Sequence, residues 1–143
     1  DYIQLEGQVT QAQVGEYMRQ ADIFAFPSIR ELGAGVVVEA MACAMACIVV
    51  DYGGPGHLIN KDRGVKVPMQ NLDDLVKSFQ QELEALVVNP ARVQALGEAA
   101  HKYAIDNLAW DAKAKKIADI YKTLTSDKGT LWSDKTAASS NQN

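Results

Sequence analysis

The apolar residues of this chain fall into short continuous runs, separated by stretches in which they recur at helical spacing. Two continuous runs, residues 22–26 and 48–50, and the short segment Val65-Lys66-Val67 are each followed within three residues by Pro or Gly. Continuous apolar runs of this length are typical of buried strands in a parallel sheet. A short alternating run in residues 1–7 predicts a further strand ahead of these three.

Helices are predicted between and after the runs. Thr10 and Gln13 fit a capping box, and Asn89 followed by Pro90 is a strong helix start. Apolar spacing and helix-forming residues indicate the other helices. In chain order, the helices are expected to begin after Thr10, to span Val37–Met45, to begin after Asn71, to begin after Asn89, and to span about Trp110–Leu124.

Alternating strands and helices predict an α/β fold, a Rossmann-like doubly wound parallel sheet. Residues 1–126 are expected to form one domain. Residues 127–143 are rich in Ser, Thr, Lys and Asn, and we expect them to form a flexible tail. Ligands of such sheets bind at the carboxyl ends of the strands, so the loops after Phe26 and Val50 are the candidate sites.

Composition narrows the class of protein. The chain has 143 residues, 48% of them hydrophobic, which is enough to bury a core. A net charge of −4 argues against nucleic acid as the main partner. The longest apolar stretch is interrupted by Glu39, so we expect no transmembrane segment and a cytoplasmic setting. The abrupt start without Met suggests a piece of a longer protein.

The cysteines and histidines favour structural roles. Cys43 and Cys47 lie four residues apart in a segment rich in Ala and Met, so we expect buried, reduced thiols rather than a disulfide. His57 and His101 lie far apart in the sequence and have no paired ligand signature. We therefore expect no metal site.

A glycine-bearing loop joins the strand at residues 22–26 to the next helix. Gly33 and Gly35 allow a ligand to approach the backbone closely, and the N–H groups of Gly33, Ala34, Gly35 and Val36 can bind an anion at the helix N-terminus. Glycines after a strand are a weak signal alone, and the pattern is neither a GxGxxG nor a Walker loop.

Two carboxylates flank this loop. Glu31 lies within it and Glu39 about one turn into the helix, with seven residues between them. A carboxylate can accept two hydrogen bonds from a diol. Taken alone, however, a Glu near a helix N-terminus is more often a surface residue that interacts with the helix dipole.

Together these motifs resemble a known family. Ala-Asp-Ile-Phe-Ala-Phe-Pro-Ser, then Glu-x7-Glu with Ala-Met-Ala, then a strand and Gly-Gly-Pro, is similar to the C-terminal, donor-binding domain of the retaining GT-B glycosyltransferases of family 4, the group 1 transferases. The resemblance runs from about Ile3 to Tyr121.

The resemblance implies a nucleotide-diphosphate-sugar donor with a UDP, GDP or ADP moiety, no metal and no further cofactor. It implies that Glu31 faces the sugar hydroxyls as the catalytic residue and that Glu39 binds the ribose. It also implies that the N–H groups of residues 33–36 meet the diphosphate. The base is expected near Gly7, Gln8 and Val9.

The chain also departs from the family. Ala44 stands where the family commonly has Gly at the end of a helix, and Ala46 where it has Pro; Ala at a left-handed position costs about 1 kcal/mol. The resemblance implies that a complete donor domain begins two strand-helix units earlier, with basic residues that bind the diphosphate, and that an acceptor domain lies N-terminal to it. We expect this part of the protein to lack these. We therefore expect the isolated chain to be inactive and to self-associate through an exposed sheet edge.

Two alternatives stay open at this point. The chain could be a non-catalytic α/β nucleotide-binding or interaction module. It could also come from a sugar-nucleotide epimerase with the same architecture, although the Glu-x7-Glu segment with Ala-Met-Ala favours the transferase.

Overall fold

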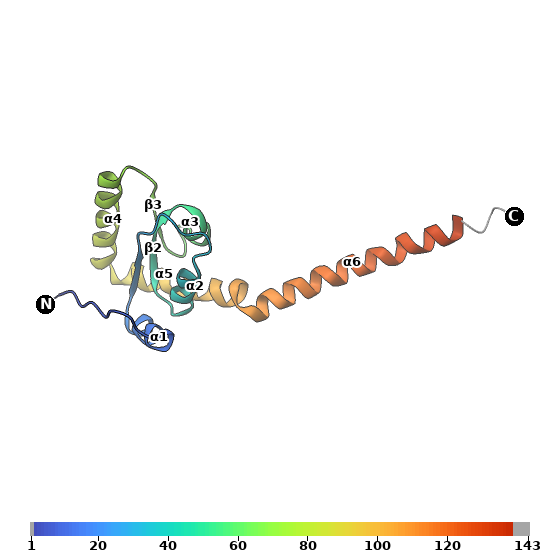
Figure 1. Ribbon diagram of the computed structural model, residues 1–143, viewed down its shortest axis with the longest axis horizontal. Coiled ribbons are helices and arrows are strands. Elements are labelled where there is room, and N and C mark those ends of the chain that lie inside the picture. Colours follow the sequence, from blue (N-terminus) through green and yellow to red (C-terminus); the bar gives the residue numbers. More distant parts are fainter. Residues whose placement is uncertain (1, 139–143) are drawn as a thin grey trace. The chain divides into compact units, whose positions relative to one another are not determined.

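The computed structural model describes the backbone of residues 2–138 and the side chains of residues 2–126 (Figure 1). The chain forms two compact units that divide after Asp106. The elements are α1 (Gln11–Gln20), β1 (Ile23–Phe26), α2 (Gly35–Ala42), β2 (Ala46–Asp51), α3 (Gly53–Leu58), β3 (Val65–Pro68), α4 (Leu72–Val87), α5 (Pro90–Tyr103), the π-helical turn η1 (Ala104–Leu108) and α6 (Trp110–Ala138).

The first unit is built on a parallel sheet with the strand order β1-β2-β3. In the register of the sheet, Ala25 pairs with Ile48, and Ile48 pairs with Val65. The expected α/β fold with a parallel doubly wound sheet is confirmed, and the two continuous apolar runs and the segment Val65-Lys66-Val67 form its strands.

Helices cover both faces of this sheet. Alternate residues of β2 point to opposite faces. On one face, Ile48 and its neighbours pack against α4 and α5, whereas Cys47 and Val49 point to the other face, where α2 contacts β2. The core on the first face consists of Ala46, Ile48, Val50, Val65, Val67, Leu75, Leu86, Val93 and Leu96.

The expected helix starts follow from local hydrogen bonds. Thr10, Asn71 and Asn89 each accept a hydrogen bond from the backbone N–H three residues further on. Thr10 forms a complete capping box with Gln13, as predicted.

Two expectations for the first unit were wrong: the strand in residues 1–7 and the bounds Val37–Met45 of the helix after β1. Residues 2–6 are not a strand: the side chains of Tyr2, Ile3 and Leu5 are at least 81% exposed, and the described part of the chain provides no neighbouring strand for their backbone groups. Helix α2 begins at Gly35 and ends at Ala42, short of the expected Met45, because Ala44 adopts a left-handed conformation (φ 60°).

The second unit contains α6, which continues past the expected end at Leu124 to Ala138. The flexible tail stays a prediction, and its last residues, 139–143, lie outside the described residues. Among residues 2–138, no helix combines the length and the apolar composition needed to cross a lipid bilayer.

Candidate functional site

The loop between β1 and α2 lies at the carboxyl end of β1, where parallel sheets bind their ligands. The carboxylate of Glu31 accepts a hydrogen bond from the backbone N–H of Ala34, with Oε1 and N 3.2 Å apart. Ala34 is buried and left-handed (φ 47°), and its carbonyl oxygen accepts hydrogen bonds from the N–H groups of Val37 and Val38. Glu31 thus holds the turn that starts α2.

This arrangement differs in one respect from the expected anion site. The N–H of Ala34, which we expected to meet the diphosphate, already donates to Glu31. Within the part of the chain that the structure describes, the N–H groups of Gly33, Gly35 and Val36 have no hydrogen-bond partner. These three groups, at the positive end of the α2 dipole, are the ones available to an anion.

Gly33 and Gly35 leave the space in front of this helix end open. A Cβ atom at either residue would meet no heavy atom within 4 Å. Neither glycine has a positive φ, so the conformation does not require Gly here. The open space itself is what allows a ligand to approach these N–H groups.

The turn after β2 supports the loop from the other side. A Cβ atom on Gly53 would lie 2.5 Å from the carbonyl oxygen of Glu31, and one on Gly54 would collide with the carbonyl oxygen of Leu32. Gly53 also has a left-handed φ of 55°. Glycine at both positions therefore lets this turn pack closely against the loop. His57, in the same short helix α3, is exposed.

Glu39 lies four residues after the start of α2, so its Cα is about 6 Å further along the helix axis than that of Gly35. Its side chain is exposed on the face of α2 that meets α1. There Oε1 of Glu39 is 3.5 Å from Nε2 of Gln11, which donates to it. Gln11 was not among the predicted site residues, because it lies 28 positions from Glu39 in the sequence.

A hollow of about 280 Å³ lies beside this pair, between α1 and α2. Its lining residues are Gln11, Gly15 and Met18 from α1 and Glu39, Ala42 and Cys43 from α2 and the residue after it.

Gly7 and Val9 lie just before α1, which begins at Gln11. Gly7 has a left-handed φ of 66° and is exposed, and Val9 is partly buried. The hydroxyl of Tyr17 donates a hydrogen bond to the carboxylate of Glu6 (2.8 Å), which ties this segment to α1 and raises the pKa of Tyr17. A role for Gly7 and Val9 in binding a base stays a prediction.

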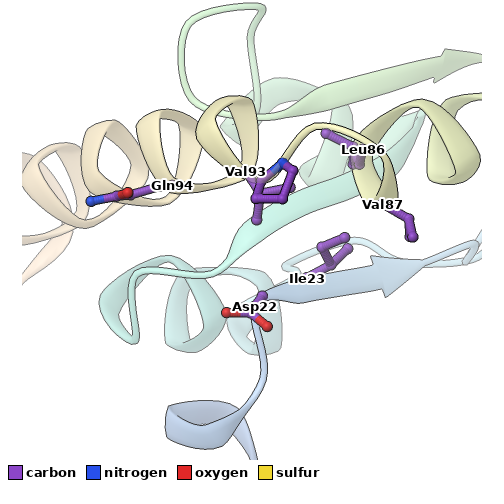
Figure 2. Close-up of a pocket in the computed structure, with 7 residues that line it drawn as sticks. Asp22, Ile23, Leu86, Val87, Val93 and Gln94 are labelled. Carbon is purple, nitrogen blue, oxygen red and sulfur yellow. The ribbon is translucent and has the colours of Figure 1, made fainter.

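Two further hollows lie on the side of the sheet covered by α4. One, of about 480 Å³, is lined by Asp22 and Ile23 at the start of β1 together with residues of α4 and α5 (Figure 2). The other, of about 350 Å³, lies between Pro27 and the apolar face of α4. The first opens at the amino end of β1, opposite to the end at which parallel sheets bind ligands.

Metal-binding side chains do not come together in the described residues, where no group of three His, Cys, Asp or Glu side chains could hold an ion. Cys43 and Cys47 are both free thiols; Cys47 is buried as expected, whereas Cys43 is only partly buried. Cys47 is fully buried, and this burial raises the pKa of its thiol to about 12.

Known proteins are similar to this chain in sequence, and a solved structure is similar to it in fold. The chain is 30% identical over 122 residues to the D-inositol 3-phosphate glycosyltransferase of Streptomyces bingchenggensis, an alignment that covers 85% of the chain and 26% of that protein. It is 28% identical over 123 residues to the alpha-maltose-1-phosphate synthase of Mycobacterium tuberculosis, covering 84% of the chain and 32% of that protein. The chain thus spans about a quarter to a third of the length of these relatives.

A solved structure of a glycosyltransferase-related enzyme is also similar to this chain. The sucrose-phosphate synthase of Thermosynechococcus elongatus superposes with a TM-score of 0.65 at 26% identity, over 85% of this chain and 30% of that one. The family model of the glycosyl transferases group 1 matches residues 1–103, which include the whole sheet and the loop with Glu31 and Glu39. The chain therefore belongs to the glycosyl transferases group 1 family.

Proposed function

We propose that this chain is the donor-binding part, the C-terminal domain, of a retaining GT-B glycosyltransferase of family 4 that uses a nucleotide-diphosphate sugar. The observation that carries the proposal is the start of α2. There, N–H groups without a partner in the described residues lie between two carboxylates, at the carboxyl end of β1. Family membership supports sugar transfer, and the relatives' names support it for those proteins.

In this proposal the diphosphate binds the N–H groups of Gly33, Gly35 and Val36. Charge that develops on the leaving diphosphate is stabilised there by oriented N–H groups and the helix dipole, with no metal. The acceptor hydroxyl attacks on the face from which the diphosphate leaves. Glu39, one turn further along α2, accepts hydrogen bonds from the ribose hydroxyls.

Glu31 is proposed to bind the hydroxyls of the transferred sugar. In the structure Oε1 of its carboxylate accepts the N–H of Ala34, so Oε2 can accept a sugar hydroxyl directly, and Oε1 can do so fully only if the hydrogen bond to Ala34 is released. Release of Ala34 would add a fourth N–H group to the diphosphate site. Donor binding and the movement of Glu31 would then be coupled.

The acceptor is proposed to bind an N-terminal domain that this chain does not include, and transfer requires the two domains to close around the donor and exclude water. The isolated chain is therefore expected to bind nucleotide without turnover. The cytoplasmic setting stays a prediction from the sequence.

Thermal unfolding with millimolar UDP, GDP and ADP tests the proposal. A ligand at about 100 times its dissociation constant stabilises the folded chain by about 2.7 kcal/mol. We expect a shift with at least one nucleotide and its loss in Glu39→Ala. Glu98→Ala is the matched control, because Glu98 is exposed on α5 and contacts Gln94 of the same helix. If no nucleotide shifts the transition of the wild-type chain, the non-catalytic module becomes the better explanation.

A further inference from the structure

The carboxyl end of α2 is held by a side chain from α5. Ala42 is the last residue of α2, and its carbonyl oxygen lies 2.7 Å from Nδ1 of His101, 59 positions further along the chain. Among the described residues, the N–H groups that follow Ala42, those of residues 43–46, all donate to other carbonyl oxygens. His101 therefore satisfies a carbonyl group that the end of the helix leaves unpaired.

The acceptor fixes the direction of this hydrogen bond. A carbonyl oxygen can only accept, so Nδ1 of His101 carries the proton. Both the imidazolium and the neutral imidazole with its proton on Nδ1 have this N–H group, so the hydrogen bond does not depend on the charge of the ring. What Ala42 requires is a donor at the δ position of residue 101.

Small residues bring α5 close to this end of α2, and the two helices are in contact (Figure 1). Gly97 lies one turn before His101, and a Cβ atom there would collide with the carbonyl oxygen of Ala44. Ala100 is fully buried, whereas the side chain of His101 is exposed. The close packing thus depends on the neighbours of His101, which itself contributes a directed hydrogen bond rather than burial.

The apolar contacts of α2 do not fix its placement completely. The side chains of Val37, Ala40 and Met41 are fully buried and hold the helix against the rest of the first unit. Apolar contacts are non-directional, however, so they restrict movement along the helix axis and rotation about it only weakly. Gly35 lies about 10 Å from Ala42 along this axis, so a movement at one end of the helix is carried to the other.

Directed hydrogen bonds at the two ends supply the missing restraint. At the start of α2, Glu31 accepts the N–H of Ala34, and at its end His101 donates to Ala42. The donors of a binding site must be held to within about 0.5 Å of their productive positions. Loss of the hydrogen bond at the end should therefore let the N–H groups at the start leave those positions.

We propose that His101 is a positioning residue of the donor site. Its hydrogen bond to Ala42 holds the N–H groups of Gly35 and Val36, at the other end of α2, in the geometry that binds the diphosphate. The proposal rests on the proposed function, because these N–H groups belong to the diphosphate site proposed there. Loss of the hydrogen bond should weaken the binding of any ligand that carries a diphosphate about fivefold, whichever base it has.

Three substitutions separate this hydrogen bond from the rest of the His101 side chain. His101→Ala removes the donor. In His101→Asn the amide nitrogen takes the place of Nδ1 and can still donate to Ala42, whereas in His101→Gln the amide nitrogen takes the place of Nε2 and lies away from it. Gln94→Ala is the matched control, because Gln94 is exposed on the same helix, is uncharged and donates to Glu98 within α5.

Isothermal titration calorimetry with pyrophosphate, UDP, GDP and ADP measures the effect at a temperature at which every chain is folded. For the ligands that bind the wild-type chain, the dissociation constants should rise about fivefold in His101→Ala and His101→Gln. They should stay within about twofold of the wild-type values in His101→Asn and Gln94→Ala. A loss of stability alone would lower the unfolding temperature and leave these dissociation constants unchanged.

The amide resonances of the ligand-free chain provide a second readout. In the ¹⁵N–¹H spectrum, the signals of Gly35 and Val36 should move in His101→Ala and His101→Gln and return to their wild-type positions in His101→Asn. An effect confined to the surroundings of Ala42 would leave both signals in place and would overturn the positioning role.

The outcomes of the titrations separate this role from the proposed function. Equal affinities of the wild-type chain and His101→Ala would overturn the role of His101 and leave the proposed function standing. Equal losses in His101→Asn and His101→Gln, or a similar loss in Gln94→Ala, would also overturn it, because the hydrogen bond to Ala42 would not be the cause. Absence of binding of pyrophosphate and all three nucleotides to the wild-type chain would overturn the proposed function, and the positioning role with it.

Discussion

The side chain of Glu31 accepts a hydrogen bond from the backbone N–H of Ala34, three residues further on, at 3.2 Å. Ala34 is 1% exposed and is the residue that precedes α2. A single carboxylate therefore fixes the start of the helix whose N-terminus is the candidate anion site. The same side chain is the one proposed to meet the sugar.

Glu31→Ala should lower the free energy of unfolding by about 1 kcal/mol, the usual net contribution of one hydrogen bond. Glu31→Gln should lose less than half of this, because its amide oxygen can still accept the N–H of Ala34. Urea unfolding of the three chains measures the difference. Equal stability of Glu31→Ala and the wild-type chain would show that the hydrogen bond does not hold the turn.

Interactions between neighbours in the sequence made most of the first unit predictable. The caps at Thr10, Asn71 and Asn89 depend on groups three residues apart. The segments that form β1, β2 and β3 could be predicted from their own apolar residues. The failed strand at residues 2–6 shows the limit. Alternation can indicate a strand, but a strand also needs a neighbour, and that depends on other parts of the chain.

The candidate site shows the same limit. Gly33 and Gly35 suggested that a ligand can approach the backbone closely, but the left-handed residue of the loop is Ala34, which donates its N–H to Glu31. The pairing of Gln11 with Glu39 joins residues 28 positions apart, and spacing along the chain contains no signal for it.

Ala44→Gly should stabilise the chain. Ala44 is exposed and left-handed (φ 60°), where a Cβ atom costs about 1 kcal/mol and contributes no burial. Ala34→Gly is the comparison: the strain is similar (φ 47°), but the buried methyl group contributes about 0.8 kcal/mol. We therefore expect a gain of about 1 kcal/mol for Ala44→Gly and almost none for Ala34→Gly in urea unfolding. A loss of stability in Ala44→Gly would contradict the assigned strain.

Gly97→Ala should destabilise the chain although Gly97 lies within helix α5. Alanine would ordinarily stabilise a helix by about 1 kcal/mol relative to glycine. Here, however, a Cβ atom would collide with the backbone carbonyl of Ala44, so α5 would have to move away from the turn after α2. The expected loss is about 1–3 kcal/mol.

Gly15→Ala in α1 is the matched control for Gly97→Ala, because its Cβ atom would meet only Arg19, at an ordinary 3.5 Å. It should be neutral or slightly stabilising. Thermal unfolding of the two variants beside the wild-type chain measures both effects, and a stabilised Gly97→Ala would mean that α5 does not pack as closely on Ala44 as the structure shows.

Ala25→Lys should reduce self-association of the isolated chain. Among the described residues β1 pairs only with β2, and Ala25, in the middle of β1, is exposed. The two hollows near the ends of β1 expose further apolar surface along α4. An unpaired strand edge beside apolar surface favours pairing with a second copy, and a lysine on an edge strand disfavours it.

Sedimentation velocity over a range of concentrations measures this effect. It should show association of the wild-type chain and weaker association of Ala25→Lys. Ala12→Lys, which adds the same charge on the exposed side of α1, is the control and should not weaken association. A wild-type chain that stays monomeric throughout, or equal effects of the two lysines, would show that the open edge of β1 is not where copies meet.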